Sequence, residues 1–506
     1  MPENPWSENK SYSNDYDLEN ELEPISSLTS DLLESEDINT HFYRGLAGRR
    51  RKAAVALSII WSGTIALHLF SWGIWVVLGL ATLMGVHALR IILARPRFVP
   101  EAIAIDEPAQ LPFVSLLVAA KNEETVISSL VSTLCGLDYP AERYELWVID
   151  DNSTDRTAEV LDQLTQTYRQ LHVVHRAADA GGGKSGALNE VWSQAKGDII
   201  GVFDADARVP SDLLRRVLPL FECDSVGAVQ VQKAVLQAED PTHPQRNNLW
   251  IRGQQAEMAL DSYFQQQRIA IGGIGELRGN GQFVRRAALE RCGGWNEETI
   301  TDDLDLTFRL HLDRWDVDFM LFPAVKEEGV TRAIGLWHQR NRWAEGGYQR
   351  YLDYWQLIVR NRMGNRKAMD MALFCMTQYI MPTAAIPDLT MAIARHTAPM
   401  LAPLTAITVV FSLIGMFLGL RRIQDGPRYA PRPSRQRANH GPTILATLFH
   451  AVYGTIYMLH WLPVIASTTA RISVRPKRLK WVKTIHHGTD EAWLNLGEQV
   501  GEQVGK

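Results

Sequence analysis

The sequence predicts an α/β domain with a mostly parallel sheet, inserted between membrane-crossing helices. Three observations favour this fold class. Short apolar runs that end in polar residues alternate with helical patterns across residues 100–360, as in a parallel sheet with helices on both faces. A stretch without Asp, Glu, Lys or Arg, Ala53–Leu89, precedes this region. Long apolar segments return after it, from Met369 onward.

The N-terminal part predicts a tail followed by a membrane hairpin. Residues 1–43 are acidic and rich in Ser and Asn, which is typical of a mobile tail. Residues 53–89 are long enough for two helices of about 20 residues each. Arginines flank this stretch on both sides, so the positive-inside rule places both of its ends, and the domain that follows, in the cytosol. The formal net charge of −5 gives no reason to expect a nucleic-acid partner.

The C-terminal part predicts two to three transmembrane or interfacial helices over residues 369–470, with a basic loop at 421–441. Three crossings would place the tail, 471–506, outside, although its basic start favours the cytosol. We therefore expect one segment to lie in the interface or to re-enter. The best candidate is Met371–Ala394, which contains two prolines and an aspartate. The number and parity of the crossings stay open at this point.

Carboxylates close two of the predicted strands, and ligands bind at the carboxyl ends of strands in such sheets. Asp204 and Asp206 follow the run "GVF" with one small residue between them, so they suit a shared Mg²⁺ or Mn²⁺. The alternative is an acidic turn after a strand. Asp150 and Asp151 end an earlier run in the same way, where the alternative is a simple helix cap.

Two further stretches are candidates for contacts with a nucleotide. "AAKNEE", from Ala119 to Glu124, ends the first predicted strand. "GGGKSGALN", from Gly181 to Asn189, is rich in glycine, which allows the backbone to approach a phosphate, and Lys184 supplies a cation. This stretch does not match the GxxxxGK[ST] pattern, so a P-loop is excluded.

A group of acids begins a predicted helix about a hundred residues later. Asp302, Asp303 and Asp305 follow Thr301, which is a suitable N-cap residue, and acids stabilise a helix N-terminus. Capping alone explains this pattern. The functional interpretation is that one carboxylate is a general base for an incoming hydroxyl group.

The stretch "GLWHQRNRWAEGGYQR" contains Gln339, Arg342 and Trp343 in the spacing QxxRW, about two dozen residues before apolar sequence returns. Without the other motifs, the tryptophan is equally well explained as an anchor at the membrane interface. The arginine is equally well explained by the positive-inside rule.

Together, these motifs over Pro112–Arg350 resemble the D, DxD, TED and QxxRW set of glycosyltransferase family 2, as in the cellulose and hyaluronan synthase group. The resemblance implies a GT-A fold, a UDP-sugar donor, inversion at the anomeric carbon and Mg²⁺ as the metal, with Mn²⁺ as the alternative. Asp302 stands where the family has Glu, which puts the role of this preceding carboxylate in doubt.

The resemblance also implies a role for each matching position. One of these positions is the acceptor loop, Gly279 to Gly281, which is equally well explained as a Gly-rich turn before a strand. The implied catalytic residues are Asp303 and Asp302; the UDP-sugar-binding residues are Ala119, Asn122, Glu123, Asp150, Asp151, Lys184, Asp204, Gln339 and Arg342; the metal ligands are Asp204 and Asp206; and the acceptor-binding residues are Trp343, Gly279, Asn280 and Gly281.

A second resemblance covers nearly the whole chain and concerns the acceptor. The acidic start, "RGLAGRRRKAA", the Trp-rich hairpin and "WVKTIHHG" are similar to the family of cyanobacterial β-monoglucosyldiacylglycerol synthases. This family transfers glucose from UDP-glucose to 1,2-diacylglycerol, which implies an integral protein of the plasma or thylakoid membrane. Two alternatives stay open, a processive polysaccharide synthase and a non-catalytic membrane scaffold. The sugar and the oligomeric state are not predicted from the residues.

Overall fold

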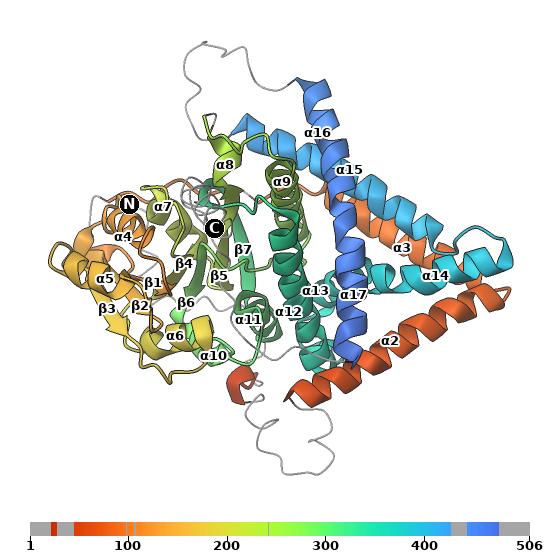
Figure 1. Ribbon diagram of the computed structural model, residues 1–506, viewed down its shortest axis with the longest axis horizontal. Helices are drawn as coiled ribbons and strands as arrows, with labels where there is room; N and C mark the ends of the chain where they lie inside the picture. The colour runs from red at the N-terminus through yellow and green to blue at the C-terminus, as the bar shows by residue number, and fades with distance from the viewer. Residues whose placement is uncertain are drawn as a thin grey trace, which may run out of the picture.

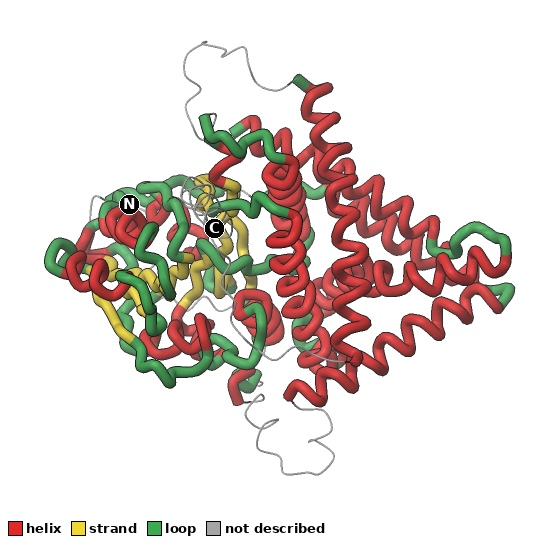
Figure 2. The backbone as a smooth tube through the Cα atoms, viewed as in Figure 1, coloured by secondary structure: helices red, strands yellow, loops and turns green. Residues whose placement is uncertain are grey.

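The computed structural model describes residues 22–27, 45–97, 99–105, 108–240, 242–426 and 443–474. Most of the predicted N-terminal tail, the basic loop from residue 427 onward and the tail from 475 lie outside these ranges. Figure 1 shows an α/β domain beside a bundle of long helices. In Figure 2 the strands lie entirely on the domain side.

A seven-stranded sheet forms the centre of the domain, in the order β3-β2-β1-β4-β6-β5-β7. All neighbours pair in parallel except β6, which is antiparallel to both β4 and β5. The prediction of a mostly parallel sheet is therefore confirmed. The strands are β1 Val114–Ala120, β2 Tyr144–Asp150, β3 Leu171–His175, β4 Ile199–Asp204, β5 Val226–Val235, β6 Gln282–Arg285 and β7 Asp316–Glu327.

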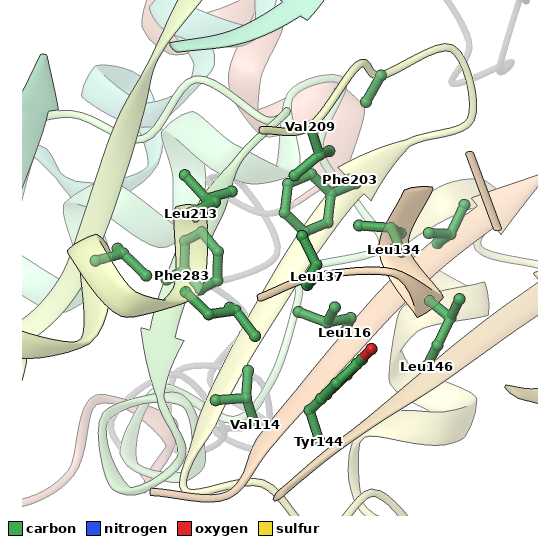
Figure 3. Close-up of a cluster of buried hydrophobic side chains, with 14 of the residues drawn as sticks. Val114, Leu116, Leu134, Leu137, Tyr144, Leu146, Phe203, Val209, Leu213 and Phe283 are labelled. Carbon is green, nitrogen blue, oxygen red and sulfur yellow. The ribbon is translucent and has the colours of Figure 1, made fainter. Parts of the chain in front are cut away.

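Apolar side chains on both faces of the sheet account for its burial. On one face, Leu116, Phe203 and Phe283 pack against α4 and α7 (Figure 3). The rings of Phe203 and Phe283 meet edge to face with centroids 5.8 Å apart. Burying each such side chain contributes about 1.5–3 kcal/mol. The domain helices are α4 Ile127–Cys135, α5 Thr157–Thr165, α6 Gly183–Trp192, α7 Leu213–Val217, α8 Leu236–Glu239, α9 Leu249–Ala270, α10 Arg286–Cys292, α11 Asp302–Leu312 and α12 Ala333–Val359.

The remaining helices form the bundle. Four helical segments of the described chain are long and apolar enough to cross a membrane: Gly48–Leu69, Gly73–Leu93, Ala402–Asp425 and Ile444–Val474. The basic loop was predicted from residue 421, but α15 continues to Asp425, so Arg421 and Arg422 are helical. The bundle helices are α2 Gly45–Leu69, α3 Gly73–Leu93, α13 Asn365–Cys375, α14 Met381–Arg395, α15 Ala402–Asp425, α16 Ile444–Tyr457 and α17 Trp461–Val474.

The bundle helices have two different directions. Figure 1 shows α2, α3, α14 and α15 extending away from the sheet, with the α2–α3 and α14–α15 loops together at the far end. There Asp388 accepts a hydrogen bond from His68 Nε2 at 2.7 Å and from the backbone N–H of Met400 at 2.8 Å. By contrast, α16 and α17 run along the boundary between the bundle and the domain (Figure 1).

A short N-terminal segment, residues 22–27, packs against parts of the domain that are more than 250 residues away in sequence. Ile25 is fully buried in a cluster with Phe308 of α11, Tyr354 of α12 and Met371 of α13. Arg291 Nη2 donates to the carbonyl of Leu22 at 2.9 Å. The segment therefore anchors the N-terminal part of the chain beneath α11.

Candidate active site

The sheet brings the predicted strand-end residues to one edge. β1 lies between β2 and β4, with Ala120 opposite Asp150 and Ala119 opposite Asp204. Because these three strands are parallel, their carboxyl ends meet at the same side of the sheet. Asp151 follows directly, and its backbone N–H donates to the carbonyl of Ala120 at 2.8 Å.

Two basic side chains hold Asp151. Arg176 Nη1 lies 2.5 Å from Asp151 Oδ1, and Lys121 Nζ lies 3.2 Å from Oδ2. Arg176 also donates to the carbonyl of Gly181 at 2.6 Å, so it joins this carboxylate to the glycine-rich stretch. Sequence reasoning missed Arg176, because a single arginine after a strand carries no motif.

His175 accompanies Asp150 at the same edge. Its Nδ1 lies 3.0 Å from Asp150 Oδ2, and this hydrogen bond raises the pKa of His175. Asp150 Oδ1 also accepts from the backbone N–H of Ser153 at 3.1 Å, which shapes the turn after β2.

Asn122 and Glu123 connect the loops that follow β1 and β2. Asn122 has a positive φ of 57°, and its side-chain oxygen accepts from the backbone N–H of Thr154 at 2.7 Å. The backbone N–H of Glu123 donates to Thr157 Oγ1 at 2.8 Å. The hydrogen bond from Thr154 to Asn122 thus holds the loop after β1 against the loop after β2.

Lys184 lies in the first turn of α6, which begins inside the glycine-rich stretch. The preceding Gly182 has a φ of 78°, and a Cβ there would lie 2.3 Å from Glu297 Oε2, so glycine is required. Lys184 Nζ lies 2.5 Å from Asp204 Oδ1. Burial alone would lower the pKa of Lys184, but the nearby carboxylates, above all Asp204, outweigh it and the pKa is raised.

Asp206, the second member of the Asp-x-Asp pair, lies beside Glu328, the first residue after β7. Asp206 Oδ2 accepts from the backbone N–H of Glu328 at 3.5 Å. Among the residues that the structure describes, no three His, Cys, Asp or Glu side chains form a metal cluster.

The first turn of α11 carries Asp302 and Asp303. Thr301 is the N-cap residue, but its side chain makes no capping bond; it packs instead against Gly346 of α12, where a Cβ would lie 2.2 Å from Thr301 Oγ1. Burial, followed by the neighbouring Asp302, raises the pKa of Asp303 to about 6. The raised pKa suits a proton acceptor that works near neutral pH.

The loop Gly279–Gly281 links these carboxylates and is also a turn before β6. Gly279 and Gly281 have φ values of 81° and 72°, and a Cβ on Gly279 would lie 3.5 Å from Asp303 Oδ2. Asn280 is fully buried; its Oδ1 accepts from the backbone N–H of Asp204 at 3.3 Å, and its Nδ2 donates to Glu327 Oε2 at 3.4 Å.

The QxxRW residues lie on α12. The indole of Trp343 is flanked by Lys233 Nζ, 5.6 Å from the ring centroid, and by the Arg340 guanidinium at 4.1 Å. Gln339 Oε1 accepts from Arg340 Nη1 at 2.8 Å. Arg342 is half-buried, and it forms no ion pair with another residue of the described ranges.

Charge and ring contacts bring five of the predicted residues near one another: Lys184, Asp204, Asp302, Asp303 and Trp343. Lys184 interacts with Asp204, Asp302 and Asp303, and Lys233 interacts with Asp303 while it contacts Trp343. The sequence analysis did not single out Lys233. Its Nζ forms an ion pair with Glu327 at 3.0 Å, and Glu327 also accepts a hydrogen bond from Asn280. This edge of the sheet therefore places cations that can bind an anionic ligand beside a carboxylate, Asp303, that can accept a proton.

Comparison with known proteins places the chain. Residues 111–346 match the family described as "Glycosyltransferase like family 2". A β-monoglucosyldiacylglycerol synthase from Nostoc sp. is 57% identical and the match covers 97% of this chain and 100% of the relative. A protein of the same name from Synechocystis sp. is 52% identical, over 98% and 99%. A solved structure, a mannosyltransferase from Pyrobaculum calidifontis with GDP-Man and Mn²⁺, is 20% identical, covers 81% of this chain and 99% of that chain, and has a TM-score of 0.45. The chain belongs to glycosyltransferase family 2, among the relatives of the cyanobacterial β-monoglucosyldiacylglycerol synthases.

Proposed function

We propose that the protein transfers glucose from UDP-glucose to the free hydroxyl of 1,2-diacylglycerol, with inversion, to give β-monoglucosyldiacylglycerol. One observation carries the proposal. Asp303, Lys184 and Asp204 converge in a single site of a chain whose near-full-length relatives bear this enzyme's name.

On the donor side, Asp151 accepts hydrogen bonds from the uracil ring. Arg176 and Lys121 orient this carboxylate. Lys184 and Arg342 neutralise the diphosphate, where negative charge grows as the bond to the sugar breaks. Ala119 and the loop of Asn122 and Glu123 form the floor beside the nucleotide, Asp150 supports the same edge, and Gln339 borders the diphosphate.

On the acceptor side, Asp303 takes the proton of the diacylglycerol hydroxyl. The hydroxyl oxygen then attacks the anomeric carbon from the face opposite the leaving UDP, so one C–O bond forms as another breaks and the configuration inverts. Asp302 raises the basicity of Asp303 by its negative charge. Trp343 and the loop of Gly279, Asn280 and Gly281 form the walls that seat the acceptor.

The residues at the end of β4 fit a hard divalent ion. Asp204 and Asp206 present carboxylate oxygens, the ligands that Mg²⁺ and Mn²⁺ prefer, and water and diphosphate oxygens complete such a site. When bound, the ion supplies positive charge to the diphosphate. We propose Mg²⁺, with Mn²⁺ as the alternative.

The bundle supports an integral membrane protein with a cytosolic catalytic domain. Exposed large apolar side chains are concentrated on its helices, for example Trp75 at 71% and Phe449 at 70% exposure. Length and composition select α16–α17 as a span and leave α14 out. The arrangement favours the reverse, because α14 extends outward beside α15 whereas α16–α17 follows the domain boundary (Figure 2).

We therefore propose that α2, α3, α13–α14 and α15 cross the membrane and that α16–α17 lies along its surface. Length and composition agree with the expectation that Met371–Ala394 lies in the interface, and our assignment is an alternative to it. The set of spans selected by length and composition and the set proposed from the arrangement both contain four crossings. Four crossings return the chain to the side of the membrane on which the domain lies. The basic tail is then cytosolic, as the positive-inside rule requires.

The test is a transfer assay with the purified full-length protein. Labelled UDP-glucose, Mg²⁺ and diacylglycerol are incubated with the protein, and the products are separated on a thin-layer plate. We expect label in a chloroform-soluble β-glucolipid. Label only in an ethanol-insoluble polymer would indicate a polysaccharide synthase, and no transfer to any acceptor would indicate a scaffold; either result refutes the proposal.

A further inference from the structure

The helix that carries Trp343 is held by a residue far outside the family domain. Trp461 begins α17 and donates its indole N–H to Glu257 Oε1 at 2.8 Å. Glu257 Oε2 forms an ion pair with Arg340 Nη2 at 2.5 Å. Arg340 is only 1% exposed, and its guanidinium lies 4.1 Å from the Trp343 centroid and 5.7 Å from that of Trp461. The matched domain ends at residue 346.

Two more polar contacts join α17 directly to α12. Thr468 Oγ1 donates to Asn341 Oδ1 at 3.1 Å, and Arg471 Nη2 lies 2.7 Å from Glu345 Oε2, whose residue is 1% exposed. Contacts from α17 therefore reach two neighbouring turns of α12, at Arg340 and Asn341 and at Glu345. These contacts hold α12 in place, whereas the contact at Trp461 alone reaches a residue stacked on Trp343.

The energies of these contacts make the arrangement rigid. Removing Glu257 would leave the buried Arg340 cation without its ion-pair partner, which is destabilising. A cation over an indole face is stabilised by the ring electrons. Arg340 gains from both, with Glu257 on one side and Trp343 on another. Its guanidinium therefore sets the plane of the Trp343 indole.

We propose that Glu257 and Trp461 are positioning residues for the transfer step. They hold Arg340, and through it the Trp343 indole, in the orientation that seats the acceptor beside Asp303. This inference rests on the proposed function. α17, which lies outside the catalytic domain in sequence, thereby completes the acceptor side of the site. On the donor side, Asp151 and Lys184 are held by Arg176 and Asp204 and make no contact with Arg340.

The test compares Trp461→Phe and Glu257→Gln with wild type as full-length proteins. Trp461→Phe keeps one aromatic ring but loses the N–H donor and the second ring of the indole, whereas Glu257→Gln keeps the shape of the side chain and loses its charge. We expect kcat for transfer to fall about 10- to 100-fold, the cost of a misplaced reacting group. The KM for UDP-glucose and the slow hydrolysis of UDP-glucose without acceptor should stay within twofold. The double variant should lose no more than the worse single variant, because both changes act through Arg340.

Two matched controls separate positioning from general damage. Leu462→Ala changes the neighbouring residue, which is exposed on α17, and Trp355→Phe changes an exposed tryptophan on α12. Both should transfer at the wild-type rate. Full transfer by Trp461→Phe overturns the inference, as does a parallel loss of transfer, hydrolysis and UDP affinity, which a merely structural role predicts. A wild-type protein that makes a polymer refutes the proposed function instead, and the same ratio of transfer to hydrolysis then tests the positioning role on that product.

Discussion

Replacing Asp303 by Asn tests the chemistry at the centre of the site. The amide has nearly the shape of the carboxyl group but cannot accept the proton of the acceptor hydroxyl. General-base catalysis is worth about 10²–10⁴ in rate, so we expect kcat to fall by at least about 100-fold. The affinity for UDP should change little, because Asp151 and Lys184 hold the nucleotide in the proposal. The measurement is transfer to diacylglycerol together with UDP binding by calorimetry.

The pH dependence gives a second magnitude for the same residue. Burial raises the pKa of Asp303 to about 6, and only the ionised form accepts a proton. For wild type, kcat should rise with pH to a plateau above about 7, with roughly half of the plateau at pH 6 and about a tenth at pH 5. The residual activity of Asp303→Asn should lack this step. A variant that keeps more than about a tenth of wild-type kcat, or retains the step near pH 6, would show that Asp303 is not the base.

The same pKa shift predicts an effect on stability, with a sign that can be worked out. The folded protein binds a proton at Asp303 more tightly than the unfolded chain does, so this group stabilises the fold most below about pH 4. That contribution is lost as the pH rises through about 6. The ionised carboxyl therefore costs stability at pH 8, by about 3 kcal/mol at most. Asp303→Asn should melt at a higher temperature than wild type at pH 8, and a lower melting temperature would contradict the buried carboxylate.

Four further changes test other parts of the structure. Gly346→Ala forces a methyl group against Thr301, so about 1–3 kcal/mol of strain should displace the start of α11 and lower kcat, whereas Gly63→Ala in α2, where no atom lies within 4 Å, should be active. Lys184→Gln removes the cation beside Asp204 and should raise the KM for UDP-glucose about 10- to 100-fold, with an unchanged KM showing that the lysine does not bind the donor. Ile25→Ala should lower stability to denaturant by about 2 kcal/mol or more, and no change would show that the segment is not docked. EDTA should abolish transfer and Mg²⁺ or Mn²⁺ should restore it, whereas full activity in EDTA refutes the metal.

The sheet and its reactive edge were predictable because the signals are local. Apolar runs mark β1, β2 and β4, and acids at their ends must share an edge once the strands are parallel. The fold class follows from that alternation. A strand after the Gly279–Gly281 turn was one of two alternatives, but the antiparallel pairing of β6 was not predicted, because pairing across about 80 residues leaves no pattern in sequence.

The supporting cations were missed for a similar reason. Arg176, Lys233 and Arg340 belong to no motif, and each matters only through a partner that folding brings near. The choice between α14 and α16–α17 as a membrane crossing was also beyond the sequence. It depends on the direction in which these helices run, which hydropathy does not contain (Figure 1).

The contact between Trp461 and Glu257 has a consequence for the order in which the enzyme is made. In the proposed site, most donor residues lie between Ala119 and Asp206 and are synthesised first, whereas Gln339 and Arg342 follow later. The proposed acceptor side also needs Trp461, near the end of the described chain. On this proposal, a nascent chain completes most of its donor side before its acceptor side. Full transfer activity would then require that α17 has been synthesised and packed against α12.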